Sequence, residues 1–416
     1  MNQPLILWVR GANYMKKGIM GTKGRNSFMI LMILIMLIPP AQATLNFYND
    51  DNSIPEAKAW TTLYYIDNDY SGSLTDPLQQ VFIDEIASTS NLNVVVIQDK
   101  LDEPALLYYI NENHTKILLE DLGEVDMADY LTLKNFIEYG KQNYPAEKYL
   151  LWIVNHGGAW KGACIDETDN STAMTMDEFQ RALSETGGVD IICFLACLMG
   201  SIETVYELRD LVDIVIGSED LAYTASWNGV CGDTNQLLTN TPDLSLEEIG
   251  SKIVNFFSEY TNPYSHKLTM SAIRTDKITP LVDALDQLVR YHTSHWFSSY
   301  RPVRIAHDST FLLADFQSWA PVFEIYDLKG YIESLPSSPE RTAVLDAFHD
   351  AVITEVHGRS MEGTNGLSIF FPAKKSPYNL VQFYKENDQG LDFAADTWWN
   401  EFLFFFVVTN TILLKY

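Results

Sequence analysis

Two apolar runs in this chain each end in a residue that can take part in acyl transfer. The run at 190–196 is followed by Cys197, and the run at 149–155 is followed by His156. Such runs predict buried parallel strands, and ligands bind beyond the carboxyl ends of those strands. Neighbouring strands that end in Cys and His would therefore share one cleft. A thiolate attacks a carbonyl carbon and an imidazole transfers the protons, so the pair predicts covalent catalysis.

The residues next to this pair suit the same chemistry. Apolar residues recur at helical spacing from Ile202 to Leu208, so we expect a helix whose amino terminus lies close to Cys197. The positive end of a helix stabilises a thiolate. Gly157 has no side chain to block a substrate, and we predict that its N–H and that of Cys197 hold the oxyanion.

At these residues the chain resembles the clostripain family of cysteine peptidases, which share the caspase-like fold. The family's Asn-His-Gly-Gly-Gly-Trp element is matched at 155–160 by Asn-His-Gly-Gly-Ala-Trp, and its Ala-Cys-Leu-Met element is matched at 196–199. A Tyr-Pro-Ala element at 144–146 and a late strand, Gly-Leu-Ser-Ile-Phe-Phe-Pro, at 366–372 also match. The resemblance implies a cysteine endopeptidase of the α/β class: a caspase-like three-layer α/β/α sandwich with a mostly parallel central sheet.

The resemblance also implies roles for single residues. Cys197 corresponds to the family's nucleophile and His156 to its general acid and base. Family members are often matured by cleavage between these two residues, and the basic residues in that interval are Lys161 and Arg181. If maturation needs a basic residue, we predict self-processing at Lys161.

One departure from the family pattern concerns substrate preference. Leu195 stands two residues before Cys197, where the family usually has Asp and where the fold forms a wall of the pocket for the residue before the cut. A preference for Arg or Lys is therefore left open. Glu219, Asp220 and Asp233 are candidates to line this pocket in place of the missing charge, although each also suits a solvated loop acid.

Residues 1–43 predict a secretory signal peptide. Basic residues precede an apolar run at 28–38, which is followed by Ala-Gln-Ala at 41–43. We therefore expect an exported protein, secreted or held at the cell surface. The apolar run is too short to cross a bilayer, and we expect no stable membrane span in the mature chain.

After the signal, we predict two regions. A caspase-like catalytic core covers 44–275, and a carboxyl-terminal helical portion covers 276–416, with the late strand at 366–372 packed on the core. Predicted strands lie at 62–66, 92–97, 149–155, 190–196, 214–217 and 268–273, and predicted helices at 77–87, 130–144, 244–260, 278–292, 339–356 and from 393. The segment 222–233 has no regular period and is interpreted as a binding loop.

The charge of the chain restricts its partners. It carries 55 acidic against 28 basic residues, a formal net charge of -27. An acidic surface of this kind disfavours nucleic acids and anionic membranes as partners. We expect peptide or protein substrates, whereas the sequence does not predict an oligomeric state.

The predicted chemistry requires no cofactor, but calcium deserves a test. The stretch at 67–72, Asp-Asn-Asp-Tyr-Ser-Gly, begins like a calcium loop, yet Leu78 occupies the twelfth position, where a bidentate Glu is needed. An ordinary polar turn is the favoured interpretation. Because the resembled family includes calcium-dependent members, a calcium ion elsewhere stays open. The cysteines form no paired zinc motif.

Other cysteines and histidines have simpler interpretations. Cys193 lies within an apolar run and is predicted to be a core residue. Cys164 and Cys231 fall in predicted loops, and the sequence leaves open whether they form a disulfide. His357 also precedes a glycine, but a helical pattern precedes it, so we predict a surface or capping position.

A second class of function stays open at this stage. A secreted caspase-like module could bind peptides or proteins without cleaving them, and the change at Leu195 favours this alternative. The presence of both His156 and Cys197 favours the peptidase.

Overall fold

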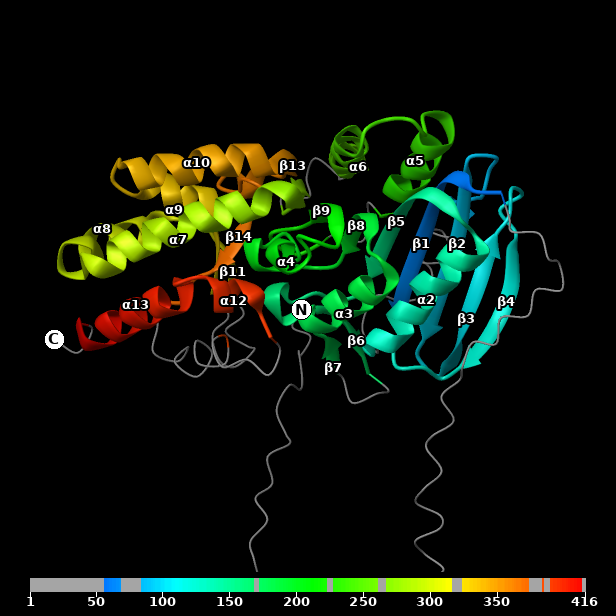
Figure 1. The fold of residues 1–416 in the computed structure, drawn as a ribbon, viewed down its shortest axis with the longest axis horizontal. Helices are drawn as coiled ribbons and strands as arrows, with labels where there is room; N and C mark the ends of the chain where they lie inside the picture. The colour runs from blue at the N-terminus through cyan, green and yellow to red at the C-terminus, as the bar shows by residue number, and fades with distance from the viewer. Residues whose placement is uncertain are drawn as a thin grey trace, which may run out of the picture. The chain divides into compact units, whose positions relative to one another are not determined.

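The fold is built on a mixed sheet of nine strands within the described residues (Figure 1). In spatial order these are β13 (Val352–His357), β10 (Thr269–Arg274), β9 (Val212–Gly217), β8 (Val189–Leu195), β5 (Ala146–Val154), β1 (Lys58–Asn68), β2 (Leu92–Lys100), β3 (Glu103–Ile110) and β4 (Lys116–Gly123). The strands from β9 to β2 run parallel, and antiparallel strands extend both edges.

The computed structural model describes residues 56–68, 84–167, 172–222, 227–260, 267–315, 324–373, 384 and 390–413. The predicted signal peptide, most of the predicted calcium loop and most of the predicted helix at 77–87 lie outside these ranges. Within them, no helix is long and apolar enough to cross a membrane.

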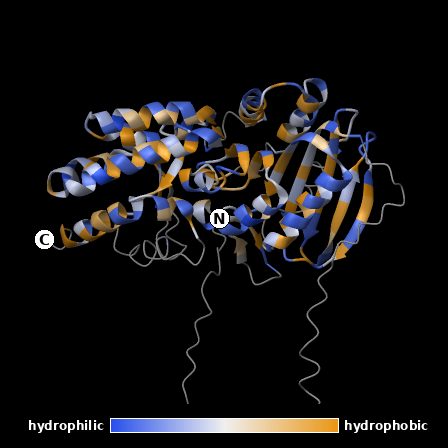
Figure 2. Ribbon diagram, viewed as in Figure 1, coloured by the Kyte–Doolittle hydropathy of each residue, from blue (hydrophilic) through white to orange (hydrophobic). Residues whose placement is uncertain are grey.

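The central strands are apolar on both faces, because helices cover both sides of the sheet. Successive side chains of a strand point to opposite faces. Leu151 and Ile153 of β5 accordingly join one hydrophobic cluster, whereas Leu150 and Trp152 join the other. Figure 2 shows hydrophobic residues gathered on the strands of this sheet.

Two groups of helices complete the three layers. The first cluster contains residues of α2 (Tyr130–Asn143), α3 (Met176–Thr186), α4 (Ile202–Glu207) and α7 (Ile278–Ser294), and the second contains residues of α5 (Trp227–Asn240) and α6 (Leu246–Tyr260). Burial of these apolar faces against the sheet provides the main favourable term for the fold. The predicted α/β/α sandwich is confirmed, with its parallel strands in the middle of a mixed sheet.

The carboxyl-terminal region packs directly against the rest of the described chain. It contains α8 (Trp296–Ser309), β11 (Leu312–Asp315), β12 (Glu324–Asp327), α9 (Leu328–Ser334), α10 (Pro339–Ala351), β14 (Ser368–Phe370), α12 (Asp392–Asp396) and α13 (Trp399–Leu413). Strands β11, β12 and β14 form a small sheet of their own. The predicted boundary at 275 stays a prediction, although β13, from beyond it, pairs with β10 of the main sheet.

Two predicted elements are wrong. The helix predicted at 339–356 ends at Ala351, and Val352–His357 is an edge strand. Its run of Val, Ile and Thr favours a strand once β10 offers an edge for pairing. Within the predicted loop at 222–233, residues from Trp227 onward belong to α5, whose apolar residues pack on the sheet.

Candidate active site

The segments that carry His156 and Cys197 meet at the carboxyl end of the parallel strands. Strands β5 and β8 pair with Val154 opposite Leu195, and the two polar residues follow these positions by two. A Cβ added to Gly157 would lie 2.2 Å from the carbonyl oxygen of Cys197. The backbone after β5 is therefore in contact with the backbone after β8, and the structure brings together the two segments that carry the predicted residues.

A buried asparagine fixes the backbone at His156. Asn155 is 3% exposed, and its side-chain amide donates to the carbonyl of Asp67 at 2.9 Å. Its side-chain oxygen accepts the N–H of Ile165 at 2.8 Å and that of His156. These bonds tie the end of β5 to the end of β1 and to β6 (Ala163–Asp166), so the direction in which His156 leaves the strand is set.

The same loop orients Gly157. The N–H of Gly158 donates to Gly162 at 2.8 Å, and the N–H of Cys164 donates to the carbonyl of His156 at 3.1 Å. Gly157 and Ala163 form an antiparallel bridge between these two bonds. Because hydrogen-bonding groups alternate along paired strands, the N–H of Gly157 points away from β6.

The segment after Cys197 is held by the end of β9. Leu198 has a φ of 67°, a left-handed conformation that costs energy for a residue with a side chain. Its N–H donates to the carbonyl of Asp220 at 3.0 Å, and the N–H of Gly200 donates to Ser218 at 2.8 Å. These bonds compensate for the strain and hold Cys197 at the carboxyl end of β8.

The expected helix terminus lies further from Cys197 than the sequence predicts. Helix α4 begins at Ile202, and Ser201 caps it by accepting the N–H of Thr204 at 3.2 Å. Instead, the N–H of Ala222 donates to the sulfur of Cys197 at 3.4 Å. The helix starts later because the intervening residues form hydrogen bonds with the segment that follows β9. A backbone donor of this kind cannot be identified from the residue type, so the sequence did not reveal Ala222.

Burial favours the uncharged forms of both candidate catalytic groups. It raises the pKa of the Cys197 thiol, an effect that the Ala222 N–H opposes and the Asp220 charge reinforces. Burial lowers the pKa of His156, against a smaller opposing effect of Glu167. Because a low-polarity environment disfavours charge, burial favours a neutral thiol and a neutral imidazole.

The predicted substrate-binding residues are placed differently from one another. Leu195 is fully buried in the second hydrophobic cluster, where strand alternation points it away from the first, and its contact with substrate stays a prediction. Asp220 lies next to Cys197 and is 5% exposed. Asp233 lies on α5, where it accepts the hydroxyl of Tyr260 at 2.8 Å.

Glu219 is engaged inside the protein. It is 1% exposed and accepts the N–H of Gly366 at 2.7 Å. Burial raises its pKa well above the usual range, and the nearby Asp327 carboxyl raises it further. In this structure Glu219 therefore connects β9 to the carboxyl-terminal region, and its predicted role in substrate binding stays untested.

The interval between His156 and Cys197 contains the predicted processing residue. Lys161 belongs to a short 3₁₀ turn, Ala159–Lys161, and its ammonium lies 5.6 Å from the centre of the Trp160 ring. Burial lowers the pKa of the Lys161 ammonium group.

Ala159, which replaces the third glycine of the resembled family, has a φ of 54°. A left-handed conformation gives a physical reason for glycine at this position.

The sequence left open whether Cys164 and Cys231 form a disulfide, and in the structure they do not. Both are free thiols and buried, and they belong to the hydrophobic clusters on opposite faces of the sheet.

In the described part of the chain, no three His, Cys, Asp or Glu residues gather in a way that could hold a metal ion. Whether the loop that begins at Asp67 is a polar turn or a calcium site is not tested, because residues 69–78 lie outside that part.

The second His-Gly pair of the sequence lies on the edge strand, where His357 is paired with Thr269 of β10. His357 ends the edge strand β13, and its imidazole pairs with Glu355 at 2.8 Å. The predicted helical run before it ends at Ala351, and its predicted surface position is confirmed because the residue is exposed.

Comparison with known proteins identifies relatives over most of the chain. The family model Peptidase_C11, described as the clostripain family, matches residues 65–408. Clostripain of Hathewaya histolytica is 24% identical over 425 residues, which cover 82% of this chain and 79% of that protein.

Two solved structures share the fold. An inactive zymogen of a C11 protease from Parabacteroides distasonis is 24% identical, with a TM-score of 0.65, and covers 83% of this chain and 99% of that one. A secreted C11 cysteine protease from Bacteroides thetaiotaomicron, in complex with an irreversible peptide inhibitor, is 19% identical, with a TM-score of 0.60, and covers 81% of this chain and 98% of that one.

Proposed function

Because the chain belongs to the clostripain family and is a cysteine-type endopeptidase, we propose that Cys197 and His156 form its catalytic dyad. The observation that carries this proposal is the contact between the two strand ends, where Gly157 lies against the carbonyl of Cys197. No cofactor is needed for the reaction.

The neutral resting pair defines the order of proton transfers. As substrate binds, His156 removes the thiol proton and the sulfur of Cys197 forms a bond to the peptide carbonyl carbon. The N–H groups of Gly157 and Cys197 stabilise the oxyanion. His156 then donates the proton to the leaving amine as the C–N bond breaks. Water, activated by the same imidazole, hydrolyses the thioester and restores the thiol.

A mixed peptide library tests the activity. We expect the protein from residue 44 onward to cut peptides, and we expect Cys197→Ala and His156→Ala to remove the cuts. Absence of cuts by the parent protein, together with a Cys197 that reacts no faster than a free thiol, would instead favour the non-catalytic binding module.

We further propose that Asp220 contributes to substrate preference. It is the predicted pocket acid that lies beside the thiol, and its carboxylate would favour a basic residue before the cut. Asp220→Asn should then reduce cleavage after Arg and Lys more than cleavage after apolar residues. An unchanged ratio would remove Asp220 from the specificity pocket.

Self-processing is proposed at Lys161. The similarity to a protein described as an inactive zymogen supports a maturation step, and Lys161 lies five residues after His156. We expect cleavage at Lys161 in the parent protein and an intact chain in Cys197→Ala by mass spectrometry. A fully active chain that stays intact would exclude this proposal.

Export is proposed from the leader at 1–43, and a relative is described as secreted. Fractionation of cells that express the full chain, compared with a chain that lacks 1–43, tests it. We expect the full chain outside the cytoplasm and its amino terminus to lie near residue 44.

A further inference from the structure

A fully buried carboxylate lies on the helix that follows Cys197. Glu203 of α4 is 0% exposed. Its oxygen accepts the main-chain N–H of Phe370 at 2.9 Å and the hydroxyl of Tyr384 at 3.3 Å. Since a buried carboxyl group without hydrogen-bond partners is destabilising, the bonds to these two donors stabilise Glu203 and hold Phe370 and Tyr384 against it.

The residues bound by Glu203 support the loop that carries His156. Trp160, four residues after His156, packs against Phe370 with ring centres 5.5 Å apart and against Tyr384 at 5.0 Å. The rings of Phe370 and Tyr384 lie 5.2 Å apart. Trp160 thus rests on two residues that Glu203 holds in place.

A second contact fixes the same strand against the segment after Cys197. The N–H of Ser368, in β14, donates to the carbonyl of Gly200 at 2.9 Å. Strand β14 is therefore attached to the cysteine side of the site by main-chain bonds and to the histidine side by aromatic packing.

We propose that Glu203 is a positioning residue that aligns His156 with Cys197 through Phe370 and Tyr384. The inference rests on the proposed dyad and adds a residue that touches neither substrate nor the reacting atoms. A small displacement of one catalytic group is enough to slow a reaction strongly, so a group that fixes the loop from behind affects the rate.

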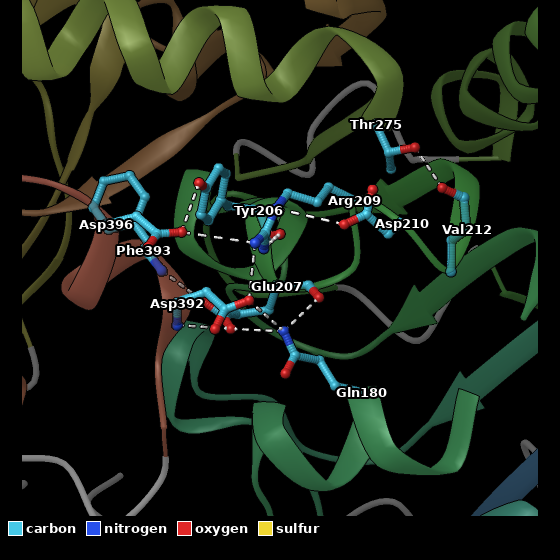
Figure 3. Close-up of polar contacts among 10 residues, drawn as sticks. All are labelled: Gln180, Tyr206, Glu207, Arg209, Asp210, Val212, Thr275, Asp392, Phe393 and Asp396. Carbon is cyan, nitrogen blue, oxygen red and sulfur yellow. Dashed lines mark hydrogen bonds and ion pairs between the residues drawn. The ribbon is translucent and has the colours of Figure 1, made fainter. Parts of the chain in front are cut away.

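The next turn of the same helix provides a matched control. Glu207 is 2% exposed and accepts the N–H groups of Asp392 at 3.1 Å and Phe393 at 2.9 Å. The amide of Gln180 donates to it at 3.0 Å. Figure 3 shows these contacts, which join α4 to α12 and α3 rather than to the loop of His156.

The experiment compares Glu203→Ala, Glu203→Gln and Glu207→Ala in the protein from residue 44 onward. We measure kcat and KM, the thermal unfolding midpoint, and the rate at which iodoacetamide alkylates Cys197 at pH 7. His156→Ala supplies the reference for alkylation without imidazole assistance. The alkylation measurement needs no peptide substrate.

For Glu203→Ala we expect kcat to fall by about 10- to 100-fold, KM to change by less than about 3-fold, and alkylation to slow toward the rate of His156→Ala. Glu203→Gln keeps an acceptor for the Phe370 N–H and should retain more than about a third of the parent kcat. Glu207→Ala should lower the unfolding midpoint while kcat and alkylation stay within about 2-fold.

Two results would overturn the proposal. One is a Glu203→Ala variant whose kcat and alkylation rate equal those of the parent protein. The other is an equal loss of kcat in Glu207→Ala, which would mark both residues as merely structural. If Glu203→Ala does not fold, Tyr384→Phe is tested in its place. We expect its kcat to fall by about 3-fold. A Tyr384→Phe variant with the kcat of the parent protein would overturn the proposal. If His156→Ala alkylates like the parent, the dyad itself fails, which is a different outcome.

Discussion

Burial shifts the pKa values of Cys197 and His156 in opposite directions, and both shifts favour the neutral form. It raises the pKa of the thiol and lowers that of the imidazole, so both neutral forms are favoured. The site therefore differs from a preformed thiolate–imidazolium pair, which needs nearby positive charge. In the proposed mechanism, charge would develop only when the proton moves from Cys197 to His156 during attack.

This neutral pair predicts a specific pH dependence. Since the ordinary imidazole pKa is 6.5 and burial lowers it, kcat/KM should stay constant at neutral pH and fall only as the pH drops below that value. Alkylation of Cys197 should continue to rise above pH 8, because the thiol pKa lies above its usual 9.0. If the alkylation rate instead reaches its plateau already at acidic pH, Cys197 and His156 form a thiolate–imidazolium ion pair.

Gly157 provides a second test at the scale of one residue. A Cβ there would lie 2.2 Å from the backbone oxygen of Cys197, whereas a Cβ on Gly158 meets its nearest atom, in Lys161, at 3.5 Å. We expect Gly157→Ala to lower kcat/KM by about 100-fold or more and to destabilise the fold by about 1–3 kcal/mol. Gly158→Ala, measured beside it in activity and urea unfolding, should be close to the parent. Equal effects of the two substitutions would contradict the predicted contact.

At the scale of elements, α4 is a short helix held by its acidic side chains. Glu203 binds β14, and Glu207 binds the start of α12. Burial raises the pKa of each carboxyl to about 7. These carboxyls are protonated at mildly acidic pH, and each loses its proton at a buried site as the pH rises.

Stability should therefore depend on pH through these two groups. A folded-state pKa above the ordinary 4.5 means that the stabilisation is complete below pH 4.5 and is lost as the pH rises through about 7. For Glu207 we expect the free energy of unfolding to fall by a few kcal/mol between pH 5 and pH 8, because a tenfold change in proton affinity corresponds to about 1.4 kcal/mol. Urea unfolding at both pH values should show a smaller difference for Glu207→Gln than for the parent. An identical difference would mean that Glu207 ionises normally.

At the scale of the whole molecule, the carboxyl-terminal region completes the described core instead of standing beside it. Strand β13 pairs with β10. Helix α7 contributes Leu281, Leu285 and Leu288 to the first hydrophobic cluster. A core that ends at the predicted boundary would lose the cover that α7 gives to part of one face of the sheet, and the edge of β10 would be unpaired.

The fragment 44–275 should therefore fail to fold alone. We expect it to lack a cooperative thermal transition in circular dichroism and to be degraded rapidly by trypsin, because α7 no longer covers the sheet. The chain 44–416 is the matched control. A fragment that unfolds cooperatively and resists trypsin would show that the boundary separates two independent domains.

The sequence by itself determined the strand ends that carry His156 and Cys197, the order of most helices and strands, and the family. These features depend on local apolar runs, helical periodicity and short motifs, which are readable along the chain. The strand at 352–357 was missed because it follows a helix without a break, and only its pairing with β10 distinguishes it.

Only the tertiary structure decided which groups meet. The contact of Gly157 with Cys197 and the N–H of Ala222 on the sulfur depend on strand register and loop path. Glu203 meets Phe370 from 167 residues away in sequence. Cys164 and Cys231 are separated by the sheet itself. Such relations, and the pKa shifts that burial causes, arise from long-range packing that no local pattern encodes.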